Sequence, residues 1–169
     1  MKKLVVSIVL MLFFANINYA QRFAYVDTEY ILSKIPVYKD ALSKLDLYSS
    51  KWQKEIEDHY KTVERKFQEY QNEKVLLSDE MKKRREEEIL NLEKTAKNLK
   101  KKYFGVGGEL FKKREELIKP IQESIYDAIQ QLATEGNYAV VFDTAGGATL
   151  LYTNIKYDKS DEILKKLGY

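Results

Sequence analysis

The chain has 169 residues, of which 33% are charged, and it contains only seven Gly, two Pro and no Cys. This composition favours long helices over a compact sheet protein. The lack of Cys excludes disulfides and a lipid-modified cysteine anchor. Without the two lysines of the leader described next, 27 basic residues face 26 acidic ones, a net charge of +1 that excludes a strongly basic nucleic-acid binder.

The first 20 residues have the pattern of a secretory signal peptide. Lys2 and Lys3 precede an apolar run from Leu4 to Ala15, and the short polar segment NINYA follows. The run is shorter than the roughly 18 apolar residues that suggest a membrane span. We therefore expect cleavage after about Ala20 and export of a mature chain that has no transmembrane segment.

A strand and a short helix are predicted directly after the leader. RFAYVD is rich in aromatic and apolar residues and ends at Asp27 and Thr28, which suit a helix N-cap before TEYILSKI. Pro36 should end this helix at Ile35, because the residue before a proline avoids the α region. Pro36 also suits the first turn of the following helix.

A long helix is predicted from Val37 onward. Its apolar residues recur at steps of four, three and four, an eleven-residue period that keeps one stripe on one side of the helix. The stripe comprises Ala41, Leu45, Tyr48, Trp52, Ile56, His59 or Tyr60, Val63, Phe67 and Tyr70. Forty residues of helix span roughly 60 Å, so much of this helix must project from a small domain.

A second helix is expected to return antiparallel to the first, after a turn near Leu77 to Asp79. Its apolar stripe comprises Met81, Ile89, Leu92, Ala96, Leu99 and Tyr103. The outgoing segment 55–80 is mainly acidic and the returning segment 94–119 mainly basic. We expect this difference in charge to favour the antiparallel pairing, although each exposed pair is worth only about 0 to 1 kcal/mol.

The returning helix contains a break and a proline. In FGVGGEL, Gly105, Gly107 and Gly108 each disfavour helix by about 1 kcal/mol relative to Ala, so a helix should end at Phe104 and restart near Glu109. Pro120 should kink this second segment without ending it. The helix is expected to close at Gly136.

The C-terminal part is predicted to contain a β-hairpin and a closing helix. The strands are 138–142 and 148–153, and the helix runs from a cap at Asp158 to Gly168. The helical hairpin returns the chain to its start, so the hairpin strands should join the first strand in one small sheet. YAVVF and ATLLY are apolar at odd and even positions, so both faces of the sheet need cover. A body of about 60 residues can cover only one face. We therefore expect further copies of the chain to cover the other, at an oligomer interface formed by Phe23, Tyr25, Val140, Phe142, Leu150 and Tyr152.

Enzymatic chemistry has little support in this sequence. His59 is the only histidine, no serine lies in a nucleophile-elbow context, and His59 is better interpreted as a packing or surface residue than as a metal ligand. GVGGELFKKRE lacks the Gly-Lys-Ser/Thr ending of a phosphate-binding loop, so a helix break is the better interpretation. We expect no catalytic, metal or cofactor site.

The aromatic residues of the long helix exceed what one two-helix seam needs. Tyrosine tolerates partial exposure, because its ring is apolar and its hydroxyl is polar. Some of these rings should therefore line an open surface that offers apolar contacts to an unfolded chain. The basic stretch KNLKKKY favours a solvated helix face, with a contact to anionic lipid as the alternative. The residues expected to bind a client are Trp52, Tyr60, Phe67, Tyr70, Lys97, Lys100, Lys101 and Lys102.

The chain resembles the Skp/OmpH family of periplasmic chaperones over residues 22–167. The resemblance is carried by FAYVDTEYILSKIP, the charged hairpin, IKPIQESIYDAIQQLATEGNYAVVFDTAGGATLLYTN and SDEILKKLG. It implies an α+β, mostly helical fold: an intertwined β-barrel trimerisation body bearing helical tentacles. Residues 21–36 and 121–169 would form this body, and 37–120 the arm, with its tip near 77–79 and its glycine break at 105–108.

By this resemblance the protein is a periplasmic holdase that keeps unfolded outer-membrane proteins in a cavity between the arms without ATP. Two features depart from the family. The mature chain is nearly neutral, which weakens the expectation of lipopolysaccharide contact, and the interrupted returning helix suggests a bent or hinged tentacle. The alternative function, from another class, is a structural coiled-coil tether of the cell envelope, which would bind folded partners at its tips.

Overall fold

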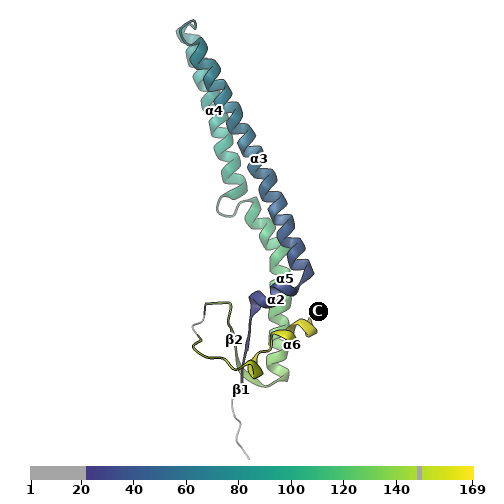
Figure 1. The fold of residues 1–169 in the computed structure, drawn as a ribbon. Coiled ribbons are helices and arrows are strands. Elements are labelled where there is room, and N and C mark those ends of the chain that lie inside the picture. Colours follow the sequence, from purple (N-terminus) through teal and green to yellow (C-terminus); the bar gives the residue numbers. More distant parts are fainter. Residues whose placement is uncertain (1–21, 148–149) are drawn as a thin grey trace, which may run out of the picture. The chain divides into compact units, whose positions relative to one another are not determined.

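The computed structural model describes residues 22–147 and 150–169 (Figure 1). The fold is mostly helical with a two-stranded sheet and a long helical hairpin, as predicted. The expected leader, with its cleavage after about Ala20, lies outside the described residues. The elements in chain order are β1 (Arg22–Val26), α2 (Thr28–Lys34), α3 (Pro36–Glu73), α4 (Asp79–Phe104), α5 (Glu109–Glu135), β2 (Tyr138–Asp143), the 3₁₀ turn η1 (Ile155–Tyr157) and α6 (Ser160–Lys166).

The chain divides into two compact units, each described separately below. The first, which we call the body, comprises the described residues up to Ile31 together with Ile125–Tyr169. The second, which we call the arm, comprises Leu32–Ser124. The division therefore falls within α2 and within α5.

The sequence signals on either side of α2 act as expected. Asp27 caps α2, because its Oδ1 accepts a hydrogen bond from the Tyr30 backbone N–H at 2.8 Å. Ile35 has extended backbone angles, with φ −83° and ψ 113°, and separates α2 from α3. Pro36 is the first residue of α3, where its missing N–H removes no helical hydrogen bond.

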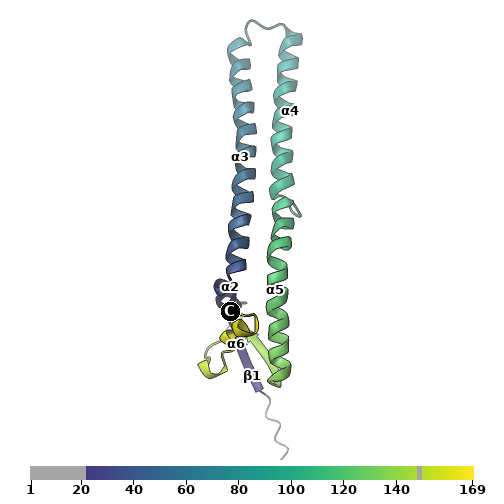
Figure 2. The same ribbon diagram turned by 90° about the vertical axis from the view of Figure 1, so that its right-hand side faces the viewer.

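The arm is an antiparallel hairpin in which α3 lies alongside α4 and the first half of α5 (Figure 2). Its buried side chains form two clusters, one between α3 and α5 and one between α3 and α4. The first consists of Ala41, Leu45 and Ile118, with Tyr38, Leu110, Leu117 and Ile121 packed against it. The second consists of Val63, Tyr70 and Ile89, with Leu77 and Leu92 packed against it.

Several members of the predicted stripes are exposed and do not pack fully in the seam. Phe67 is 45% exposed and Met81 is 51% exposed. Lys66 is half-buried in place of Phe67, and its Nζ lies 3.1 Å from a carboxylate oxygen of Glu88 on α4. After Val63, the next residue that faces the seam is therefore Lys66, three residues on, and not Phe67, four residues on as predicted. The Phe67 ring lies outside the seam.

The ion pairs of the arm do not follow the expected pattern, in which an acidic outgoing helix would pair with a basic returning helix. The ion pairs that join α3 to α4 are Lys66 with Glu88 and Arg85 with Glu73, and in the first of these the basic residue is on the outgoing helix. Most other ion pairs of the arm link residues three or four apart within one helix, as Lys61 does with Glu57. The charges are largely balanced within each helix, so pairing across the hairpin is rare.

The turn between α3 and α4 covers Lys74 to Ser78, a few residues earlier than the sequence suggested. Ser78 is the N-cap of α4, and its hydroxyl accepts a hydrogen bond from the Met81 backbone N–H at 3.3 Å. Val75 and Leu76 in this turn are 92% and 87% exposed.

The glycine segment breaks the returning helix at the predicted residues, since α4 ends at Phe104 and α5 begins at Glu109. The backbone N–H of Gly105 bonds to the carbonyl of Lys101, and that of Gly108 bonds to the carbonyl of Gly105. Pro120 lies inside α5, which continues past it to Glu135, as the sequence predicted.

The sheet of the body pairs β1 with β2 in parallel. Phe23 lies opposite Val140 and Tyr25 lies opposite Phe142, so these four residues share one face of the sheet. Ala24 and Val26 point to the other face and are each only 2% exposed. The buried residues of the body also include Ile31, Ile125, Ala128, Leu132, Ile163 and Leu164.

The predicted hairpin of 138–142 with 148–153 is wrong in its described part. Residues 148–149 lie outside the described residues, and Leu150 to Thr153 belong to no strand. β2 pairs with β1 instead, and the other side of β1 is bonded near Asp158, where the Lys159 N–H donates to the Tyr25 carbonyl at 2.9 Å. An apolar segment becomes a strand only where a neighbour accepts its backbone hydrogen bonds, and none of the described residues does so for Leu150 to Thr153.

Candidate functional site: an open sheet face and a groove on the arm

One face of the two-stranded sheet is apolar and uncovered. We call it the open sheet face, formed by Phe23, Tyr25, Val140 and Phe142. Phe23, Val140 and Phe142 are 47%, 42% and 42% exposed, although residues of these types are usually buried. Contiguous exposed apolar side chains are a common feature of protein surfaces that bind a partner.

A depression of about 750 Å³ lies in the body over this face. Leu150, Tyr152 and Tyr157 from the chain after β2 line it together with Phe23, Tyr25 and Phe142. The structure therefore places the six residues predicted for an oligomer interface close together, since Val140 shares the face through its pairing with Phe23. Tyr157 was missed by the sequence analysis, because it lies beyond the predicted strand 148–153 and belongs to a 3₁₀ turn that no periodic pattern marks.

A polar network at the ends of both strands positions this face. The carboxylate of Asp143, the last residue of β2, accepts hydrogen bonds from the Thr28 backbone N–H at 3.2 Å and from the Thr28 hydroxyl at 2.7 Å. The Ser160 hydroxyl accepts from the Asp27 N–H at 2.9 Å and donates to Asp158 at 2.7 Å. These bonds join the ends of β1 and β2 to the starts of α2 and α6.

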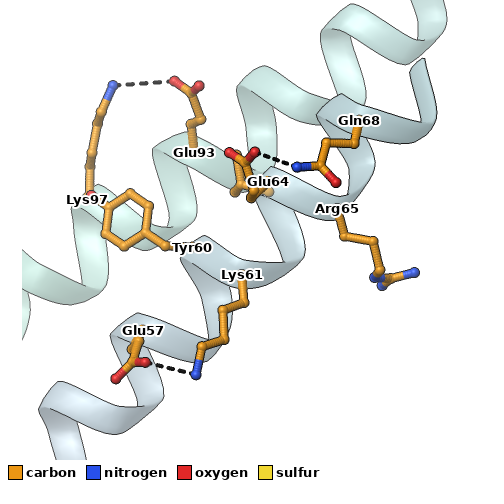
Figure 3. A pocket seen from close by; sticks show the side chains of 9 residues that line it. Glu57, Tyr60, Lys61, Glu64, Arg65, Gln68, Glu93 and Lys97 are labelled. Carbon is orange, nitrogen blue, oxygen red and sulfur yellow. Dashed lines mark hydrogen bonds and ion pairs between the residues drawn. The ribbon is translucent and has the colours of Figure 1, made fainter. Parts of the chain in front are cut away.

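A second concave surface lies on the arm between α3 and α4. We call it the arm groove; it has a volume of about 750 Å³ and is lined by Glu57, Tyr60, Lys61, Val63, Glu64, Arg65, Gln68, Glu93 and Lys97. Figure 3 shows the Tyr60 ring projecting from α3 toward the side of the groove that Glu93 and Lys97 of α4 provide. Two of the residues predicted to bind a client, Tyr60 and Lys97, thus lie at one site.

The charged side chains of the arm groove already have partners. Lys61 lies 2.7 Å from Glu57, and Lys97 lies 3.4 Å from Glu93. The hydrogen bond and charge of Lys61 lower the pKa of Glu57, and Glu57 in turn raises the pKa of Lys61. The groove therefore presents an aromatic ring among mutually neutralised charges.

The other residues predicted to bind a client differ in how accessible they are. Phe67 is exposed and lies two turns beyond Tyr60 on the same side of α3. Tyr70 is only 4% exposed and donates a hydrogen bond to Glu86. Trp52 is half-buried, with its ring stacked on those of Tyr48 and Tyr103. Tyr70 and Trp52 belong mainly to the hairpin seam, which leaves Tyr60 and Phe67 as the accessible aromatic residues of this set.

The predicted basic stretch does not form a single patch. Lys97, Lys100, Lys101 and Lys102 are all exposed, but successive residues of a helix point about 100° apart and so face different sides. Lys97 pairs with Glu93, and the Nζ of Lys102 lies 5.1 Å from the centre of the Tyr103 ring.

The described residues contain no cluster of three or more His, Cys, Asp or Glu side chains able to hold a metal ion. His59 is half-buried on α3. None of the helices in residues 22–147 and 150–169 is long and apolar enough to cross a membrane.

Comparison with known proteins decides the family. The family described as "Outer membrane protein (OmpH-like)" matches residues 22–167. The chain belongs to the OmpH-like family. This family is not one of enzymes, which agrees with a sequence that has no catalytic pattern.

A solved structure shares the fold of this OmpH-like chain. It is the crystal structure of an OmpH-like protein from Caulobacter crescentus CB15, described as a candidate outer membrane chaperone. The match has a TM-score of 0.70 at 10% sequence identity and covers 87% of this chain and 83% of that chain. No curated protein matches the sequence.

Proposed function

We propose that this protein is an ATP-independent holdase of the periplasm that binds unfolded outer-membrane β-barrel proteins and prevents their aggregation. The observation that carries the proposal is the open sheet face in a chain of the OmpH-like family. A single copy leaves Phe23, Val140 and Phe142 in water, and burial of such side chains stabilises an assembly by about 25 cal/mol per Å² of apolar surface. Further copies of the chain cover this face in the proposal.

The proposed assembly is a homotrimer whose bodies pack together through an intertwined β-barrel and whose arms surround a cavity. Leu150 to Tyr152 would find in a neighbouring copy the strand partner that they lack among the described residues. The arms would then offer many weak apolar contacts to a client. Weak contacts allow release without nucleotide, because a better partner such as the membrane is sufficient to withdraw the client.

The test is dilution of a urea-unfolded outer-membrane β-barrel protein into buffer with the mature protein and no nucleotide. Light scattering is recorded beside the mass of the chaperone assembly. We expect scattering to be suppressed when the assembly is present in molar excess over the client. Undiminished scattering of several unrelated clients, together with tight binding of a folded envelope protein, would favour the tether instead.

A further inference from the structure

We propose that the arm groove captures apolar side chains of an extended, unfolded polypeptide, and that electrostatic attraction to charged groups of this polypeptide does not contribute to the capture. The inference deepens the proposed holdase function and rests on it. Its consequence is that retention of a client should depend on Tyr60 in the groove and on Phe67, which directly precedes the groove residue Gln68, and should change little with salt.

The aromatic side chains needed for such capture are accessible on one side of α3. Tyr60 is 39% exposed and Phe67 is 45% exposed, and their spacing of seven residues places them on the same side of the helix. Neither ring is needed to close the seam, because Val63 and Tyr70 fill it at this level together with Ile89. The two rings therefore remain free to contact another chain.

The charges around these rings cancel one another. The groove residues include three cations and three carboxylates, so their formal charges sum to zero. Lys61 and Lys97 are paired with groove carboxylates, and the third cation, Arg65, lies 3.2 Å from Glu69 just outside the groove. The remaining carboxylate, Glu64, accepts a hydrogen bond from Gln68 at 2.8 Å.

This arrangement selects the chemistry of the occupant. A charged group of a client would have to displace an existing partner three or four residues away on the same helix, and it would meet no net potential to attract it. An apolar or aromatic side chain meets the Tyr60 ring, Val63 and the aliphatic stems of Lys61 and Lys97. The occupant that fits is therefore an uncharged, aromatic-rich segment of an unfolded chain.

The experiment compares the mature wild-type assembly with the double variant Tyr60→Ser/Phe67→Ser and with the control Phe111→Ser. Phe111 is 52% exposed and also lies on the arm, but it is on α5, whereas Tyr60 and Phe67 are on α3. The probe is a fluorescently labelled, urea-unfolded outer-membrane β-barrel protein. Its affinity is measured by titration at about 50 mM and about 500 mM NaCl, which changes the screening length about threefold.

We expect the wild type and Phe111→Ser to bind equally well and to change by less than about twofold between the two salt concentrations. The double variant should bind about tenfold more weakly at both, as the loss of two partly buried aromatic contacts predicts. Circular dichroism and mass should be unchanged, because both rings are exposed in the arm. These results would support the groove as the capture site.

Several results would overturn the inference. Equal binding by the double variant, or equal weakening by Phe111→Ser, would show that the arm groove is not the capture site. A fall in wild-type affinity of more than about tenfold at high salt would show that charge dominates capture. In each of these cases the wild type still retains the client, so the holdase function stands. Failure of the wild type to bind at either salt concentration would reject the holdase function and the inference with it.

Discussion

Trp52 shows why a highly charged helix contains so many aromatic residues. Its ring stacks on Tyr103 of α4 at a centroid distance of 4.9 Å and on Tyr48 at 5.5 Å. The Tyr103 hydroxyl donates a hydrogen bond shared by the two carboxylate oxygens of Glu55, each 3.1 Å away. The buried Tyr103 and the half-buried Trp52 fill the seam at the level where α4 ends, and the more exposed Tyr48 stacks on them from one side. These aromatic residues stabilise the arm, whereas Tyr60 and Phe67 remain on its surface.

The buried Tyr103 makes the arm sensitive to alkaline pH. Burial, followed by the hydrogen bond to Glu55, raises the pKa of Tyr103 above its ordinary value of 10.0. The folded chain therefore holds this proton more tightly than the unfolded chain, and the resulting stability is present below about pH 10 and is lost as the pH rises through the folded-state pKa. Thermal unfolding should show a larger loss of stability above pH 10 in the wild type than in Tyr103→Phe.

The control for this prediction is Tyr126→Phe. Tyr126 is 67% exposed, so its removal should leave the alkaline loss of stability as it is in the wild type. If Tyr103→Phe and the wild type lose stability in parallel up to pH 11, Tyr103 does not couple the arm to pH.

Among the elements of the arm, α3 is continuous and its antiparallel partner is not. α3 runs without interruption for 38 residues, past the level at which the glycine segment separates α4 from α5. The Lys113 Nζ of α5 lies 5.7 Å from the Tyr48 ring centre, and Tyr103 of α4 stacks on Trp52, so α3 contacts both sides of the break. The break therefore lies opposite an intact helix, which should limit the bending that the glycines alone would allow.

The glycines of the break are required by space and by backbone conformation. A Cβ on Gly105 would lie 2.3 Å from the Lys101 carbonyl oxygen, and one on Gly108 would lie 2.8 Å from that of Lys102. Gly107 has a φ of +68°, a conformation that residues with a Cβ rarely adopt.

Gly105→Ala should lower the free energy of unfolding by more than about 1 kcal/mol, because backbone atoms must move to admit the methyl group. The melting temperature measured by circular dichroism should fall by several degrees. The matched control is Gly146→Ala, where the nearest atom to a new Cβ would be 3.7 Å away and the melting temperature should hardly change. Equal melting temperatures for Gly105→Ala and the wild type would show that the loop rearranges without cost.

For the whole molecule, the decisive feature is the open sheet face of the body. Phe23 and Phe142 lie on it, beside the exposed Leu150 and Tyr152. If further copies cover this face, a charge placed on it has to be buried without a partner, which costs several kcal/mol. The proposed trimer therefore depends on these few side chains.

Phe142→Asp should convert the mature protein from trimer to monomer at micromolar concentration, as measured by light scattering coupled to size-exclusion chromatography. Tyr126→Asp replaces an exposed aromatic residue elsewhere in the body and should leave the trimer intact. A folded, monomeric wild type at the same concentration would contradict the proposed assembly and the cavity that depends on it.

The sequence alone determined those features that depend on near neighbours in the chain. The extended Ile35 before Pro36, the cap at Asp27, the long apolar period of α3 and the helix break at Phe104 and Glu109 all follow from local backbone and packing preferences. The apolar residues on both faces of YAVVF likewise indicated that the sheet has a face which one chain leaves open.

Only the tertiary structure decided which distant segments meet. That the first strand and residues 138–142 share a sheet was expected, but only the structure shows that they pair directly and in parallel and that Leu150 to Thr153 form no strand. The inward place of Lys66 and the outward turn of Phe67 depend on Glu88 across the seam, 22 residues further along the chain. The division of the aromatic residues between the seam and the exposed surface of the arm was decided in the same way, since the facing helix determines which rings are covered.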